Sequence, residues 1–176
     1  MQKASILFIL LVIFIKSYPQ ILETDVINEV TGDRTRHTSW ETLHNDFRFV
    51  VFFRITAVND IHFFEMKLII GSGKAFSIDR GQELVFTFNN NSAITLYNIE
   101  KAVTHVGGGS KAGRWYRSTK GLKVRYALSP GHMQALQQNK LKSCRIYTDD
   151  GFIEPKKITK NYHLIVRALE LMGVGE

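Results

Sequence analysis

One segment of the chain combines glycine, basic and aromatic residues in a way that suits the binding of anions. Residues 107–117 read Gly-Gly-Gly-Ser-Lys-Ala-Gly-Arg-Trp-Tyr-Arg. Glycines allow backbone amides to converge on an anion, arginine offers two parallel donors to an oxyanion, and an aromatic ring can stack on a base or a sugar. The alternative interpretation is a solvated loop whose positive charges pair with acidic residues elsewhere in the domain.

The positive charge of the chain is concentrated around this segment. The sequence has 23 Lys and Arg against 16 Asp and Glu, a net charge of +7, and residues 101–148 contain ten basic residues and no acidic one. If these residues share a face, Trp115 or Tyr116 should be partly exposed in it, and binding to a polyanion should weaken steeply with salt. The expected binding residues are Lys111, Arg114, Trp115, Tyr116, Arg117, Lys120, Lys123 and Arg125.

Other residues that could take part in catalysis or metal binding lack the spacing that these functions need. The run from Gly71 to Lys74 invites comparison with a phosphate-binding P-loop, but Leu68 and Ala75 stand where that motif needs Gly and Ser or Thr. The six histidines include no pair four residues apart and no His-Glu-x-x-His motif. Cys144 lies within an expected strand and is predicted to be a core residue.

We therefore predict a protein that is not an enzyme, with no catalytic residue, no metal and no cofactor. A metal or catalytic site assembled from distant Asp, Glu and His residues remains the alternative.

The first twenty residues have the pattern of an export signal. Lys3 precedes an uncharged apolar run from Ala4 to Ile15, and polar residues return at Lys16. Twelve helical residues span about 18 Å, less than the roughly 30 Å core of a bilayer. We expect a signal peptide over residues 1–20 and a periplasmic or secreted protein with no integral membrane span after its removal. An uncleaved anchor is the alternative, because Pro19 is unfavourable beside a cleaved bond.

Most of the chain beyond this segment has the two-residue period of β-strands. Apolar residues alternate with polar ones over residues 47–57, 64–70, 84–88 and 122–128, and this pattern predicts an antiparallel meander with one buried face. Turn-forming residues at 58–60 predict that the first two runs form a β-hairpin. Strands are also expected over residues 93–97 and 141–148. The expected core comprises Phe49, Val51, Phe53, Ile55, Phe64, Met66, Leu68, Phe86, Leu96, Val124, Ile146 and Leu169.

Residues 31–46 allow two interpretations. Thr38 and Glu41 have the spacing of a capping box, which favours a short helix. The Thr- and Arg-rich run from Arg34 to Trp40 also suits an extended edge segment, and we favour the strand.

Two helices are expected in the C-terminal third. Ser129 and Pro130 begin a helix of about ten residues, and Thr159 is expected to cap a second helix that ends at Gly173. A hairpin turn at residues 149–151 lies between them. This order predicts an α+β fold, a mainly antiparallel β-sheet meander with a helix inserted before a late hairpin and a C-terminal helix, in a single domain over residues 25–173.

Three blocks of the sequence resemble small exported proteins of gut-type Gram-negative bacteria. The blocks are Thr38–Leu43, Phe76–Leu84 and Arg145–Glu154, around a Gly-rich centre. The likeness spans roughly residues 25–172. It implies export and a common fold. It implies no activity, and no functional residue is carried over from it.

Three function classes follow from these observations. The first is a non-catalytic binding module whose basic loop recognises an anionic envelope polymer, either an acidic glycan or lipopolysaccharide phosphate. The second is an accessory subunit of an envelope assembly, which docks a protein partner through a sheet edge or a Phe-rich face. The third, an envelope hydrolase, has the least support. A salt-dependent pull-down against polyanions separates the first class from the second.

Overall fold

The centre of the fold is the long hairpin that the sequence predicts. The computed structural model describes residues 21–46, 49–70, 75–107, 119–155, 158 and 161–173. In it, β4 (Phe49–Val58) and β5 (Ile61–Ile70) pair antiparallel in continuous register. Asn59 turns the chain with a φ of 53°, a left-handed conformation that Asn tolerates better than most residues. The predicted turn at this point is thus confirmed.

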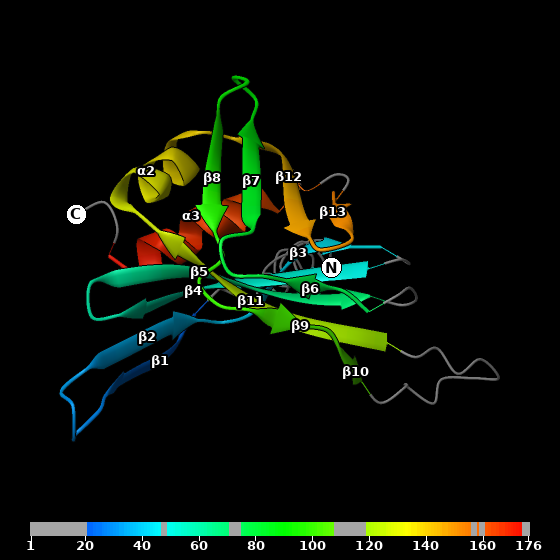
Figure 1. Cartoon of the computed structure of the whole chain (residues 1–176). Coiled ribbons are helices and arrows are strands. Elements are labelled where there is room, and N and C mark those ends of the chain that lie inside the picture. Colours follow the sequence, from blue (N-terminus) through cyan, green and yellow to red (C-terminus); the bar gives the residue numbers. More distant parts are fainter. Residues whose placement is uncertain are drawn as a thin grey trace, which may run out of the picture.

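Seven strands form the large sheet around this hairpin (Figure 1). Their order is β1-β2-β4-β5-β11-β10, and β3 also pairs with β4. The further strands are β1 (Leu22–Ile27), β2 (Arg34–Thr38), β3 (Glu41–Asn45), β10 (His105–Gly107) and β11 (Thr119–Leu128). The strand interpretation of residues 31–46 is confirmed. Thr38 does not cap a helix, because its buried Oγ1 accepts a hydrogen bond from the Ile55 N–H at 3.1 Å.

A smaller sheet and two helices cover one face of the large sheet (Figure 1). The small sheet has the order β13-β12-β7-β8, and a short pair joins β6 to β9. The strands are β6 (Ser77–Ile78), β7 (Glu83–Phe88), β8 (Ala93–Tyr97), β9 (Ala102–Val103), β12 (Leu141–Thr148) and β13 (Gly151–Ile153). The fold is therefore the α+β architecture dominated by antiparallel sheet that the sequence predicts.

One helix begins where it was predicted and the other does not. In α2 (Pro130–Gln138) the Ser129 Oγ accepts a hydrogen bond from the His132 N–H at 3.2 Å. The residue before α3 (Tyr162–Leu171) is Asn161, so the predicted cap at Thr159, which lies outside the described residues, is wrong. Asn161 donates its side-chain amide to the Thr42 carbonyl at 2.9 Å, and this bond ties the start of α3 to β3.

Aromatic rings from both sheets form the middle of the core. Phe53 and Phe64 stack with ring centroids 5.4 Å apart, and Phe64 meets Phe86 of the small sheet edge-on at 5.3 Å. Eleven of the twelve predicted core residues are buried. Phe49 is the exception, since it lies half-buried at the start of β4 beside His44. α3 packs on the same core through Ile165 and Leu169.

Tyr126 carries a polar group into this core. Its side chain is fully buried, and its hydroxyl has no hydrogen-bond partner among the described residues. Burial accordingly raises the pKa of this phenol. Tyr126→Phe removes the unsatisfied hydroxyl and keeps the ring, so we expect the free energy of unfolding to stay the same or rise by about 1 kcal/mol. Urea denaturation measures this change, and a loss of more than about 1 kcal/mol would show that the hydroxyl is satisfied.

Candidate anion-binding face

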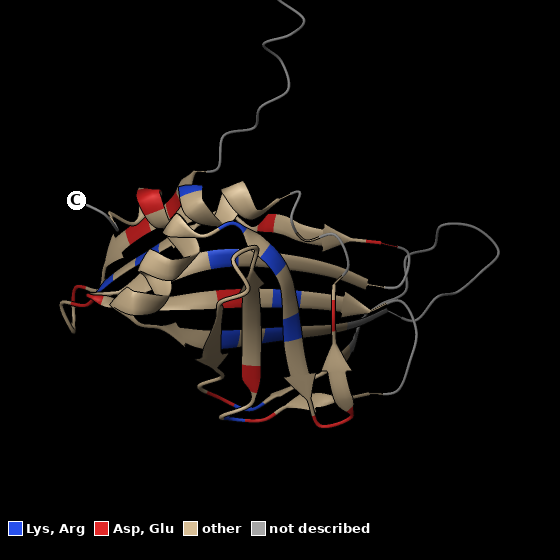
Figure 2. Ribbon diagram, turned by 90° about the horizontal axis from the view of Figure 1, so that it is seen from above, with Lys and Arg blue, Asp and Glu red and all other residues tan. Residues whose placement is uncertain are grey.

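The three central strands of the large sheet present aligned rows of side chains on the face turned away from the core. Neighbouring residues of a strand point to opposite faces, and paired residues of adjacent strands lie side by side. The strand pairing places Arg54, Glu65 and Arg125 in one row across β4, β5 and β11. The next row contains Phe52, Lys67 and Lys123. In Figure 2, basic positions lie on neighbouring strands of this sheet, close to an acidic position.

Glu65 is the centre of the first row and is fully buried. Arg54 Nε donates to its Oε2 at 2.7 Å, and Arg125 donates to its Oε1 from Nε at 2.8 Å and from Nη2 at 2.6 Å. Lys123 Nζ lies 3.4 Å from Oε2. Burial raises the pKa of Glu65, but the hydrogen bonds from Arg54 and Arg125 outweigh burial and hold the pKa below its usual value. Glu65 is therefore a carboxylate.

Trp40 lies over the second row, at the connection between β2 and β3. The distance to the centre of its indole ring is 4.0 Å from Lys67 Nζ, 4.6 Å from Arg54 Cζ and 5.9 Å from Lys123 Nζ. Cations are attracted to the electron-rich face of indole, so the ring holds these groups together. We call Trp40, Arg54, Glu65, Lys67, Lys123 and Arg125 the basic face.

Positive charge exceeds negative charge in the basic face. Arg54, Lys123 and Arg125 pair with its one carboxylate, Glu65, and Lys67 adds a fourth cation over the Trp40 ring. This excess of positive charge acts on Lys67. Burial and the positive charges of Arg54 and Lys123 lower the pKa of its ammonium, whereas the charges of Glu23 and Glu65 act to raise it, and the net shift is downward. An anion bound beside Lys67 would relieve this repulsion and raise the pKa of the ammonium.

An open hollow of about 380 Å³ adjoins the basic face. The pairing of β10, β11 and β5 places His105, Gly121 and Ile69 in one row. At Gly121 no atom lies within 4 Å of the position that a β-carbon would take, so this position is open. The lining residues are Lys67, Leu68, Ile69, His105, Gly121, Leu122 and Lys123.

The structure brings two of the eight predicted binding residues together. Lys123 and Arg125 lie on the same face of β11, and both approach Glu65. Lys120 belongs to β11, but its side chain is not described. The other five, Lys111, Arg114, Trp115, Tyr116 and Arg117, lie outside the described residues, so the expected exposure of Trp115 or Tyr116 stays a prediction.

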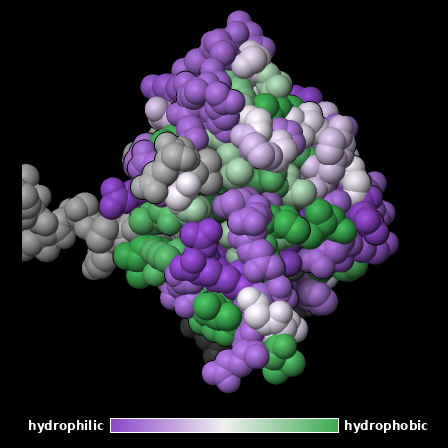
Figure 3. All heavy atoms as spheres, turned by 90° about the vertical axis from the view of Figure 1, so that its left-hand side faces the viewer, coloured by the Kyte–Doolittle hydropathy of each residue, from purple (hydrophilic) through white to green (hydrophobic). Residues whose placement is uncertain are grey.

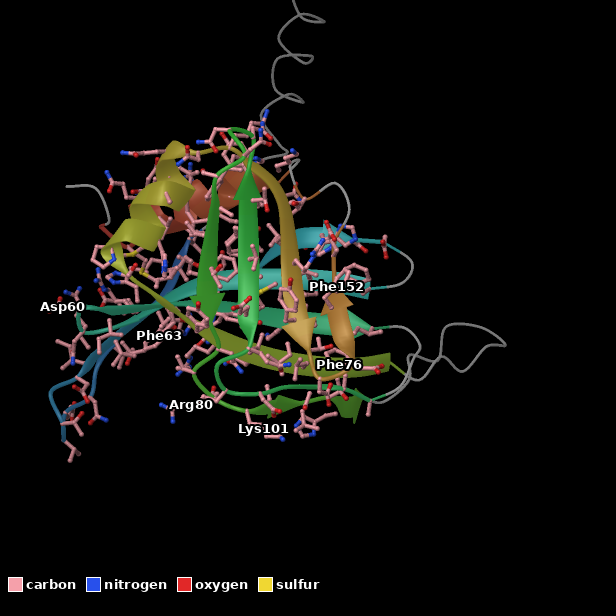
Figure 4. The ribbon with its side chains drawn as sticks, turned by 45° about the horizontal axis from the view of Figure 1, so that its top comes forward. Asp60, Phe63, Phe76, Arg80, Lys101 and Phe152 are labelled. Carbon is pink, nitrogen blue, oxygen red and sulfur yellow. The ribbon has the colours of Figure 1, made fainter. Side chains whose placement is uncertain are left out.

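Other basic residues of the 101–148 block belong to different surfaces. Lys101 pairs with Asp79 at 2.9 Å in the connection that follows β8. Arg145 lies on the small sheet, where it pairs with Glu154 at 2.9 Å and covers the ring of Phe152 at 4.4 Å. Figure 4 labels Lys101 and Phe152 at these separate places. The charged block of the sequence is thus divided between surfaces in the fold.

Sequence reasoning missed four residues of the basic face, namely Trp40, Arg54, Glu65 and Lys67. A usable signal existed for two of them. A two-residue turn at Asn59 and Asp60 places Arg54 opposite Glu65, and both stand at outward positions of their strands. Nothing local in the sequence indicates that Trp40 approaches them.

Two features of the described part of the chain concern catalysis and metal binding. Cys144 is fully buried, and burial raises the pKa of its thiol, so its prediction as a core residue is confirmed. Among the residues that the structure describes, no three His, Cys, Asp or Glu side chains are grouped so that they could hold a metal ion. The described helices are also too short or too polar to cross a membrane.

Comparison of the chain with protein-family models, with curated proteins and with solved structures gives no match.

Proposed function

We propose that this protein is an exported, non-catalytic binding module that holds an anionic envelope polymer on its basic face. The observation that carries the proposal is the pairing of three cations with the one carboxylate of the basic face, with Lys67 as a fourth cation over Trp40, which leaves a net charge of +3 in the basic face. Export is supported by the apolar segment at residues 4–15. The expected ligands are an acidic glycan or the phosphates of lipopolysaccharide.

The cations of the basic face differ in how much they can offer a ligand. The side chain of Lys123 is 51% exposed and that of Arg125 is 33% exposed, whereas that of Arg54 is only 13% exposed. The guanidinium of Arg125 has five N–H donors, and only its Nε and Nη2 atoms bond to Glu65. Lys123, Arg125 and the half-buried Lys67 are therefore the contacts for an anion, and Arg54 mainly neutralises Glu65.

The glycine-rich basic segment of the sequence directly connects two strands beside the basic face. Residues 108–118 join β10 to β11, the strands that carry His105 and Lys123. The five predicted binding residues between 111 and 117 therefore belong to a connection that starts and ends on strands beside the basic face. A polymer bound by both this connection and the basic face would neutralise many charges, and its affinity would fall steeply with salt.

Removal of two lysines tests the proposal. In the variant Lys67→Gln with Lys123→Gln, we expect affinity for polyphosphate and for dextran sulfate to fall at least tenfold at low salt. The slope of log K against log salt should become shallower by about 1.5, because two fewer counterions are released. Isothermal titration at several salt concentrations measures both quantities. Unfolding by urea should change little, because these lysines are partly exposed.

A matched control removes two lysines from another surface. Lys140→Gln with Lys142→Gln makes the same change in net charge at exposed positions next to and within β12. This control should keep at least half of the affinity of the unmodified protein. Equal losses in the two variants would mean that only overall charge matters, and the basic face would lose its assigned role.

Docking of an envelope protein is the second candidate function. β1 is an edge strand of the large sheet, and Val26 and Ile27 are 56% and 61% exposed on it. An edge with apolar side chains can pair with a strand of another protein. Figure 3 shows hydrophobic residues on one side of the molecule as separate groups between hydrophilic ones. Purification with one partner at fixed stoichiometry in high salt would favour this function over polyanion binding.

A further inference from the structure

We infer that the hollow beside Gly121 holds the fatty acyl chain of an anionic lipid whose headgroup lies on the basic face. This inference rests on the proposed function and narrows its ligand to an anionic amphiphile, as in the lipid part of lipopolysaccharide, rather than an acidic glycan. The observation behind it is that one face of the large sheet carries an apolar row of residues directly beside the rows that contain the cations.

The row of the sheet beside the lysines of the basic face is apolar. Strand pairing aligns Val50, Ile69, Gly121 and His105 across β4, β5, β11 and β10, and none of these four is Lys, Arg, Asp or Glu. Ile69 is 38% exposed, and Gly121 has open space where a side chain would stand. The hollow of about 380 Å³ at this place is lined almost entirely by apolar atoms.

The two lysines separate the hollow from the charged part of the basic face. Lys67 Nζ lies 4.0 Å from the centre of the Trp40 ring, and Lys123 Nζ lies 3.4 Å from Glu65 Oε2. Both ammonium groups are therefore directed away from Gly121. Because the stem of a lysine is a chain of methylene groups, the part of each lysine that lines the hollow is apolar. A ligand that contacts both regions must have an apolar part and a charged part.

The charge beside the hollow selects an anionic headgroup. The basic face has a net charge of +3. Glu23 and Glu65 both act on Lys67, but burial and the neighbouring cations outweigh them and lower the pKa of its ammonium. A phosphate headgroup above the cations would relieve their mutual repulsion, whereas a neutral or cationic headgroup would not.

The size of the hollow suits part of an acyl chain. Its volume of about 380 Å³ is near the lower end of the range of about 300–1,000 Å³ for small-ligand pockets. Each methylene group that leaves water for an apolar site strengthens binding about fourfold. Affinity should therefore rise with the length of the chain until the hollow is filled.

Alkyl phosphates of increasing length test this inference. Titration calorimetry compares butyl, hexyl and octyl phosphate at concentrations below those at which micelles form. We expect octyl phosphate to bind at least tenfold more tightly than butyl phosphate. Octyl glucoside, which has the same chain and no charge, should bind at least tenfold more weakly than octyl phosphate. Equal affinity within either comparison, or no binding of any alkyl phosphate, would overturn the inference.

Gly121→Val narrows the hollow without changing any charge. The variant should fold, because no atom lies within 4 Å of the added β-carbon and valine is favoured in strands. We expect it to bind octyl phosphate at least tenfold more weakly and to keep its affinity for polyphosphate within twofold. The matched control, Ala127→Val, enlarges an exposed residue on the same face of the same strand and should change neither affinity more than twofold. Unchanged octyl phosphate binding by Gly121→Val would contradict the inference.

A second pair of variants decides the matter if Gly121→Val does not fold. Ile69→Asn places a polar group in the wall of the hollow, and Ile61→Asn makes the same exchange at a 61% exposed position of the same strand. Only Ile69→Asn should reduce the gain in affinity from butyl to octyl phosphate. An equal gain in the two variants would overturn the inference.

Polyphosphate distinguishes failure of this inference from failure of the proposed function, because it carries charge without an apolar chain. The double variant Lys67→Gln with Lys123→Gln should bind both polyphosphate and octyl phosphate at least tenfold more weakly. If it loses polyphosphate while the unmodified protein binds all alkyl phosphates equally, the acyl-chain site fails and the basic face stands. If the double variant keeps both ligands, the headgroup does not lie on the basic face and both proposals fail.

Discussion

Phe53→Ala is expected to lower the free energy of unfolding by about 3–5 kcal/mol. Phe53 is fully buried, and its ring stacks on Phe64, which in turn meets Phe86 of the small sheet. Alanine removes the ring from the layer where the two sheets meet and leaves a cavity that rigid strands cannot close. Chemical denaturation monitored by far-UV circular dichroism measures the loss.

The control for this prediction is a phenylalanine on the surface. Phe152 is 55% exposed on β13, and Phe152→Ala should cost less than about 1 kcal/mol, because exposed positions contribute little to stability. A similar small cost for Phe53→Ala would show that the two sheets do not share this core.

Local patterns predicted the strands and turns that depend on neighbours in the sequence. The alternation over residues 47–57 and the turn at Asn59 together fix β4, β5 and their register, and the structure differs from the prediction only at the strand ends. Ser129 and Pro130 likewise mark the start of α2 by chemistry contained in one turn of helix. These features need no information about distant parts of the chain.

Features that depend on distant partners were missed. β1 contains acidic residues and has mostly exposed side chains, so its sequence lacks an amphipathic pattern, and it is a strand because it pairs with β2. The candidate site depends on similar long-range pairing. Lys123 lies opposite Lys67 only because β11 pairs with β5, and Trp40 reaches them from the connection that follows β2. The basic face therefore follows from the topology of the sheet, which the sequence alone did not give.

Glu65→Gln is expected to change stability and anion binding in opposite directions. The variant removes the charge that Arg54 and Arg125 surround in the buried row. Loss of one partner from a buried ion pair costs about 3–5 kcal/mol, and we expect about 3 kcal/mol here, since Arg125 and Lys123 are partly exposed and regain some hydration. Urea unfolding at pH 7 measures this loss, with Glu83→Gln on the small sheet as the control.

The pH dependence of stability gives a second signature of Glu65. Its pKa is lowered in the folded state, so its contribution to stability is complete above the ordinary glutamate pKa of about 4.3 and is lost as the pH falls through the lower folded value. The unmodified protein should therefore lose stability in this acidic window. Glu65→Gln should lack that part of the loss, and identical pH profiles of the two proteins would mean that the carboxylate is not charged when folded.

Glu65→Gln should strengthen anion binding although it lowers stability. Glu65→Gln raises the net charge of the basic face from +3 to +4, so the affinity for polyphosphate at low salt should rise and its salt dependence should become steeper. Sucrose can keep a weakened variant folded during the titration. A folded variant that binds polyphosphate more weakly would show that Glu65 serves mainly to position Arg125 and Lys123. A rise in affinity would show that the buried carboxylate stabilises the sheet while it competes with the ligand for the same cations.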